Sequence, residues 1–211
     1  MSDVYQHMEL GLRFVKKVLK EKFTEELHTL YGVLDPDAPY DADGFWLDGL
    51  GAVYLKPGPS LQEMRKPARV AAFVSIFTPT EDNPLNGQTS IYQISDAGSF
   101  AVARLQVAVT LVIEAVSQEE ITLDGEVLDT SEILGLRALR YLGALKHTIT
   151  KWCAFYPEAR AAWPINDYPF SGEIQVSPRQ GQSESVTVAM AHLEFALEQD
   201  LTLPTPQKLI L

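Results

Sequence analysis

The chain has 211 residues, 46% of them hydrophobic, and a net charge of -11, which together predict one globular domain with a real core. The acidic balance opposes general binding to a phosphate backbone, which needs clustered Lys and Arg, although a local basic patch is compatible with it. No apolar run approaches the roughly 20 residues of a membrane span, and residues 1–30 carry charge throughout. We therefore expect no membrane partner and no signal peptide, and we expect synthesis in the cytoplasm.

The first predicted element is a helix over residues 3–31, because apolar side chains recur there at steps of three and four residues and Gly32 stands at its end. Residues 33–67 are rich in Pro and Gly, which excludes long regular elements. They are nevertheless too apolar for a disordered linker. We interpret them as an ordered insertion with a short strand at 51–55.

Three strands are predicted next. Residues 68–77 are apolar on both faces, as in an interior strand, and residues 89–94 are rich in strand-forming types. Residues 95–98 predict a turn into a long strand at 100–116, where odd positions are apolar and even positions are mixed. The polar and charged side chains of that mixed face are Arg104, Gln106, Thr110 and Glu114.

A small hairpin is expected at Asp124-Gly125, and Asp129 with Glu132 forms the sequence of a capping box for a second helix at 131–156. Residues 157–184 are interpreted as a loop, because of their prolines, with a short strand at 172–176.

The closing strand is predicted at 186–197. Its apolar positions change from even to odd in mid-strand, which predicts a β-bulge. The C-terminal tail, 199–211, has two prolines and an apolar end and is expected to dock on a surface.

These elements predict a single α+β domain over residues 1–211. Its order is α-β-β-β-α-β-β, with a mainly antiparallel sheet meander and two long helices packed on one face.

Reactive side chains do not form a recognisable site. Cys153 has no CxxC partner, and the loop around Asp41 and Asp43 fails the EF-hand frame, because Pro39 would stand at the first ligand position. His192 and Glu194 share a strand face unless the bulge lies between them, and they form either a structural pair or a proton-transfer pair. We expect no catalytic residue, no metal and no cofactor.

The order of elements is similar to that of a known family. The long strand (SFAVARLQVAVTLVIEAV), the long helix (SEILGLRALRYLGALKHTITKW) and the closing strand (SVTVAMAHLEFALEQDL) resemble those of the tail terminator proteins of long-tailed bacteriophages. The resemblance covers most of residues 68–200, and the insertion at 33–67 goes beyond the family pattern. It carries no catalytic signature.

The resemblance implies a structural virion protein of the neck or tail, not an enzyme. Such proteins form a homo-oligomeric ring, usually a hexamer, that caps the tail tube and joins it to the head-side connector proteins, with DNA only as passing cargo. It also implies candidate subunit-contact or lumen-facing residues, for which the alternative is an ordinary solvent-facing surface. These candidates are Arg104, Gln106, Thr110, Glu114 and Arg137.

Two alternatives stay open. The chain fits another head-tail connector or tail structural protein. It also fits a small-molecule-binding α+β domain with a pocket lined by Trp46, Tyr54, Trp152 and His192.

Overall fold

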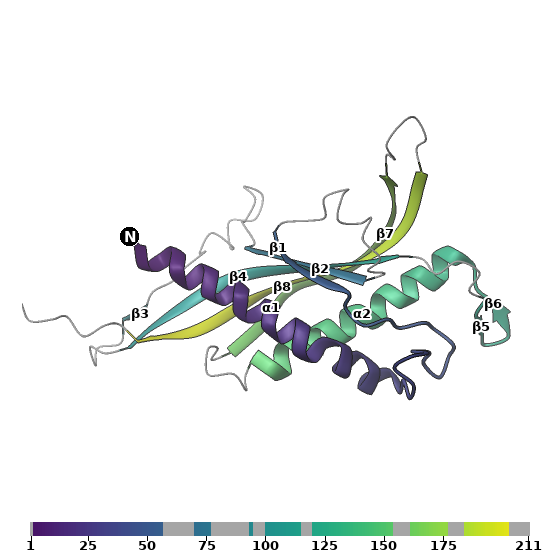
Figure 1. Ribbon diagram of the computed structural model, residues 1–211, viewed down its shortest axis with the longest axis horizontal. Helices are drawn as coiled ribbons and strands as arrows, with labels where there is room; N and C mark the ends of the chain where they lie inside the picture. The colour runs from purple at the N-terminus through teal and green to yellow at the C-terminus, as the bar shows by residue number, and fades with distance from the viewer. Residues whose placement is uncertain are drawn as a thin grey trace, which may run out of the picture.

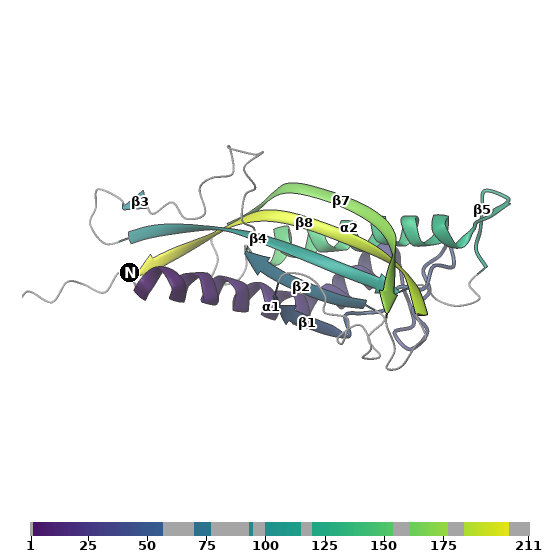
Figure 2. The same ribbon diagram turned by 90° about the horizontal axis from the view of Figure 1, so that it is seen from above.

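The computed structural model describes residues 2–56, 70–76, 93–94, 100–114, 120–153, 161–176 and 184–202. Two long helices lie on one face of a twisted sheet, so the domain has two layers (Figures 1 and 2). The expected turn at 95–98, most of the strand at 89–94 and the end of the tail lie outside the described residues.

Both predicted helices are confirmed. Helix α1 (Ser2–Tyr31) is followed by Gly32, whose φ of +66° is the left-handed conformation that ends helices. Helix α2 (Thr130–Cys153) begins with the predicted capping box. There Asp129 Oδ1 accepts the N–H groups of Ser131 at 2.8 Å and Glu132 at 2.9 Å, and Glu132 Oε2 accepts the Asp129 N–H at 2.8 Å.

The sheet confirms the α+β class and has the strand order β1-β2-β4-β8-β7, with the short β3 (Gln93–Ile94) paired to β4. Its strands are β1 (Ala52–Leu55), β2 (Val70–Ile76), β4 (Phe100–Glu114), β8 (Glu184–Thr202) and β7 (Ala161–Val176). All pairs are antiparallel except β1 with β2, so the sheet is mixed. The predicted hairpin is β5 (Thr122–Leu123) with β6 (Glu126–Val127), and it forms a separate ribbon.

The main core lies between the helices and the odd-numbered face of β4. Leu105, Val107, Val109, Leu111 and Ile113 are all buried there against apolar side chains of α1 and α2. The even-numbered side chains of β4 from Gln106 to Glu114 therefore lie on the face that the helices leave uncovered. A smaller apolar cluster of Phe73, Val112 and Val188 is buried on that helix-free face.

The loop interpretation is wrong for residues 161–171, because β7 is a sixteen-residue strand that also contains the short strand expected at 172–176. Residues 157–160 and 177–183 lie outside the described residues. Two of the prolines that suggested a loop, Pro164 and Pro169, lie in β7. They are tolerated there because β7 is the end strand of the sheet, where an N–H that faces away from β8 has no ladder partner to lose. A register shift between Pro164 and Asn166 marks an irregularity there.

The bulge expected in β8 is also wrong. β8 pairs with β4 in one continuous register from Val188 to Thr202. Its apolar pattern changes phase for another reason. Val188 is buried on the helix-free face, whereas Leu193, Phe195 and Leu197 are buried under the helices. The apolar positions of β8 therefore follow the face of the sheet that is covered at each point along the strand.

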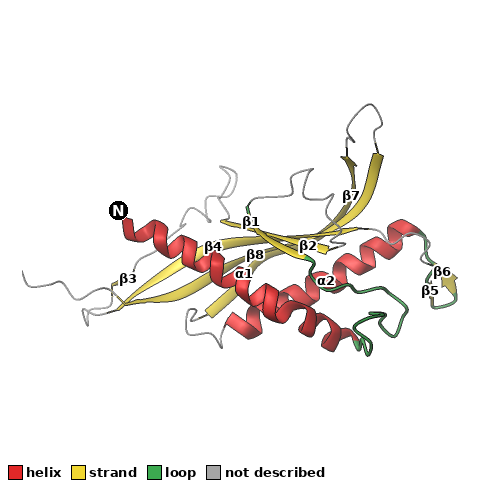
Figure 3. Ribbon diagram, viewed as in Figure 1, coloured by secondary structure: helices red, strands yellow, loops and turns green. Residues whose placement is uncertain are grey.

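The described part of the insertion, residues 33–56, is an ordered loop followed by β1 (Figure 3). It approaches α1 closely at Gly49, where an added Cβ would lie 2.5 Å from Thr24 Cγ2. The Leu50 N–H donates to Thr24 Oγ1 at 3.2 Å. His28 Nε2 also lies 3.0 Å from the Leu47 carbonyl oxygen. The insertion is thus held against the helix layer.

Candidate functional site

One row of side chains crosses the helix-free face of the sheet. The strand register places Tyr54, Phe73, Thr110, His192 and Tyr168 opposite one another on five successive strands. Tyr54 stacks on Phe73 with ring centroids 5.2 Å apart, and Tyr168 stacks on His192 at 4.8 Å. The row is therefore aromatic at both ends and polar in the middle.

Three side chains contact the His192 ring: Thr110, Tyr168 and Glu194. Thr110 Oγ1 lies 2.9 Å from His192 Nδ1, and Glu194 Oε1 lies 3.2 Å from His192 Nε2. The predicted shared face of His192 and Glu194 is thus confirmed. Both ring nitrogens are engaged, and Tyr168 covers one ring face. Burial, and then the nearby Glu194 carboxylate, raise the pKa of Tyr168.

Three of the candidate contact residues of β4, Gln106, Thr110 and Glu114, lie on this same face. Gln106 is buried at 7% exposure, and its Oε1 has no hydrogen-bond partner within the described residues. Thr110 and Glu114 are half-buried. Arg104 lies opposite Glu198 in the β4–β8 register, and only its backbone is described.

Arg137 does not join that group. It lies on α2 and is 1% exposed, the largest of the fully buried side chains. Its guanidinium therefore presents almost no surface to another subunit. A charged side chain in a helix is usually solvated. The sequence nevertheless carried a sign of this burial, because Arg137 follows Leu134 by three residues and so lies on the apolar stripe of the helix.

Asp41 and Asp43, whose loop fails the EF-hand frame, bind Arg140 of α2. Arg140 Nε donates to Asp41 Oδ2 at 2.8 Å, and Arg140 Nη2 donates to Asp43 Oδ2 at 2.6 Å. The guanidinium also lies 3.8 Å from the ring centroid of Phe45. These carboxylates fasten the insertion to α2. In the described part of the chain no three potential metal-ligating side chains cluster.

A second polar cluster joins the two helices. Glu26 on α1, with its side chain 4% exposed, accepts hydrogen bonds from Lys151 Nζ and Trp152 Nε1, each at 2.7 Å. His147 Nε2 lies 3.0 Å from Glu26 Oε2. Burial alone would raise the pKa of Glu26, but the hydrogen bonds from Lys151 and Trp152 and the neighbouring positive charge outweigh it, so that pKa is lowered.

Sequence reasoning missed the Glu26 cluster, although a signal was present. Glu26 follows Phe23 by three residues and precedes Leu27, so it lies on the apolar stripe of the helix. A carboxylate in that position is buried and requires partners.

The aromatic pocket expected for a small-molecule-binding domain does not form. Trp152 contacts the charged groups of α1, with Lys22 Nζ 4.3 Å from its ring centroid. Trp46 packs edge-on against Tyr40 in the insertion. Tyr54 and His192 share the helix-free face, but Phe73 and Thr110 lie between them in the row. The four side chains thus line no common cavity.

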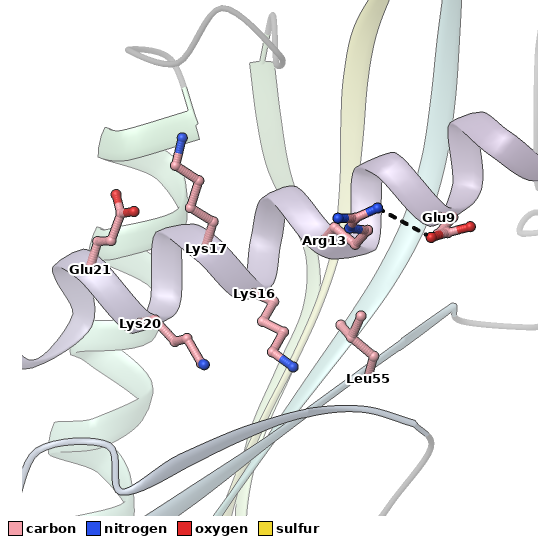
Figure 4. A pocket seen from close by; sticks show the side chains of 7 residues that line it. All are labelled: Glu9, Arg13, Lys16, Lys17, Lys20, Glu21 and Leu55. Atoms are coloured by element: carbon pink, nitrogen blue, oxygen red, sulfur yellow. Dashed lines mark hydrogen bonds and ion pairs between the residues drawn. The ribbon is translucent and has the colours of Figure 1, made fainter.

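An open groove of about 570 Å³ lies along the exposed face of α1 beside β1 (Figure 4). It is lined by Glu9, Arg13, Lys16, Lys17, Lys20, Glu21 and Leu55. Four of these seven residues are basic, although the chain as a whole is acidic. Over the part of the chain that the structure describes, no helix is long and apolar enough to cross a membrane.

A scan of the chain against protein families finds no match, and a search of curated proteins finds no similar sequence.

Proposed function

We propose that this chain is a structural virion protein that assembles into a ring, as tail terminators of long-tailed phages do. The ring, of about six copies, caps the tail tube and joins it to the connector proteins on the head side, and DNA only passes through it. One observation carries the proposal. The closing strand β8 pairs with every residue of the long strand β4, from Phe100↔Thr202 to Glu114↔Val188, at the centre of the sheet. This pairing joins the long strand and the closing strand, two of the three elements on which the resemblance to tail terminators rests.

The shape of the sheet supports assembly. A closed ring of identical subunits needs two different contact patches on each subunit. The sheet narrows at both ends, to β3, β4 and β8 at one end and to β7 and β8 at the other. At one end, residues 199–202 of β8 pair with β4 but not with β7, and at the other end residues 184–187 pair with β7 but not with β4. Each subunit thus has two distinct extensions, and Figure 1 shows the β7–β8 extension bending away from the helices.

Extension of the sheet through the middle of β7 is disfavoured. Pro164 and Pro169 interrupt the row of N–H donors that a neighbouring strand would need, a common protection of end strands. Contacts between subunits are therefore expected at the two narrow ends of the sheet and at the helix layer.

The proposal is tested by the mass of the purified protein in solution. Sedimentation velocity over a range of protein concentrations should give a species of about six times the 23.4 kDa chain mass. Negative-stain images of that species should show rings with a central pore. A chain that stays monomeric or dimeric at the highest attainable concentration would contradict the proposal.

A further inference from the structure

The groove on α1 is a basic surface in an acidic protein. Arg13 forms an ion pair with Glu9 at 3.4 Å, so these two charges largely offset each other. Lys16 and Lys20 point to the same side of the helix, toward β1, where Leu55 forms the apolar part of the groove (Figure 4). Leu55 is 38% exposed. The groove therefore combines positive charge with an apolar contact, which fits an acidic protein element with an exposed apolar side chain.

The β5–β6 hairpin and the start of α2 have the opposite character. Residues 120–132 contain five acidic residues and no Lys or Arg. Asp129 and Glu132 serve the helix cap, whereas Glu120, Asp124 and Glu126 are exposed. Val127 is 72% exposed on the same hairpin. An apolar side chain among carboxylates on a projecting hairpin has the chemistry that the α1 groove would accept.

The groove and the hairpin cannot meet within one chain. The groove lies along the middle of α1, from Glu9 to Glu21, and the hairpin projects beyond the start of α2 at one end of the molecule in both views (Figures 1 and 2). Two different complementary patches on one subunit form a head-to-tail contact, which closes into a ring where the rotation between copies allows closure. The net charge of -11 opposes a nucleic acid as occupant of the groove.

We infer that the acidic β5–β6 hairpin of one copy docks in the basic groove on α1 of the next copy. Val127 of the hairpin packs against Leu55 of the groove, and Glu120 and Glu126 face Lys16 and Lys20. This contact rests on the ring proposed above and names the two surfaces that would form it. Because its charges lie at the surface, the contact weakens as salt concentration rises.

Charge reversal tests the contact. Lys20→Glu and Glu126→Lys are each expected to raise the dissociation constant for self-association about tenfold, because each change places like charges opposite one another. The double variant Lys20→Glu/Glu126→Lys should restore assembly. Asp37→Lys is the control, since it makes the same charge change as Glu126→Lys at an exposed position of the insertion. Sedimentation velocity at low and high NaCl reports all four.

The outcomes separate the two proposals. Rings that form equally well with either single reversal would overturn the docking contact and leave the ring intact. Dimers or open chains that respond to reversal and are rescued by the double variant would confirm the contact and contradict the ring. A monomeric wild-type chain would overturn both. Binding of a short labelled DNA duplex that Lys20→Glu abolishes, without any change in assembly, would assign the groove to nucleic acid and overturn the docking contact.

Discussion

The Arg140 guanidinium on α2 donates from Nε to Asp41 Oδ2 at 2.8 Å and so joins two residues that are 99 positions apart. Asp41 has a side chain that is only 4% exposed, and its Oδ1 accepts the backbone N–H groups of Asp43 and Phe45. One carboxylate thus shapes the turn of the insertion and fastens it to the second helix.

Replacing Arg140 should loosen the insertion. Arg140→Met is expected to lower the free energy of unfolding by about 2–4 kcal/mol, because it leaves the nearly buried Asp41 carboxylate without its cation. Adding Asp41→Asn should recover part of this loss, since the amide is neutral and keeps an acceptor for the turn. Urea unfolding measures both variants. A loss below about 0.5 kcal/mol for Arg140→Met, the size expected of an exposed ion pair, would refute this role.

The Glu26 cluster should make stability depend on acid pH. The folded-state pKa of Glu26 lies below its ordinary value of 4.5, so its contribution is fully present above pH 4.5 and is lost as pH falls through the folded pKa. Glu26→Gln is expected to cost about 1–2 kcal/mol at pH 7. That difference from wild type should shrink as unfolding is repeated below pH 4.5. A difference that stays constant with pH would show that the charge of Glu26 does not matter.

The Thr110 hydroxyl should stabilise the helix-free face. Thr110→Val keeps the side-chain shape and leaves His192 Nδ1 without the contact that now lies at 2.9 Å, at an expected cost of about 1–2 kcal/mol. Thr122→Val, at an exposed position of β5, is the matched control and should change stability by less than about 0.5 kcal/mol. Equal effects of the two changes on the urea midpoint would count against the hydrogen bond.

Gln106 should be dispensable for folding. Its Oε1 is buried and has no hydrogen-bond partner within the described residues, so Gln106→Leu removes an uncompensated polar group. Stability should stay the same or rise by up to about 1 kcal/mol in urea unfolding. We also expect the variant's mass in solution to match that of wild type, because the side chain is already buried in its own subunit. Weaker assembly without loss of stability would instead assign Gln106 to a subunit contact.

Sequence signals within a few residues were sufficient to predict the elements that form through local interactions. The capping box at Asp129 and Glu132 lies within four residues, and Asp124-Gly125 forms its turn with both residues at positive φ, 53° and 87°. The long α1 was predicted from its apolar stripe, and β4 from its alternation. Each depends on side chains that are neighbours in sequence.

The errors have a common cause. Prolines in residues 157–184 favoured a loop, and only the position of β7 at the end of the sheet makes them compatible with a strand. The phase change in β8 suggested a bulge, and only the covering of both sheet faces explains it. Arg137 was a candidate subunit-contact or lumen-facing residue, and it is buried within its own subunit. In each case the partner that decides the outcome is distant in sequence.

The sequence by itself determined the helices, the strand-forming segments and the α+β class, because periodicity and capping act over a few residues. The tertiary structure decided which strands became neighbours and which charges met. Thr110 and His192 are 82 residues apart, and Glu26 and Trp152 are 126 apart. Such pairs form only when strand register and helix packing bring them within 3 Å of each other. Likewise, only the fold shows that basic residues of α1 form a groove and that the acidic hairpin is a separate surface of opposite charge.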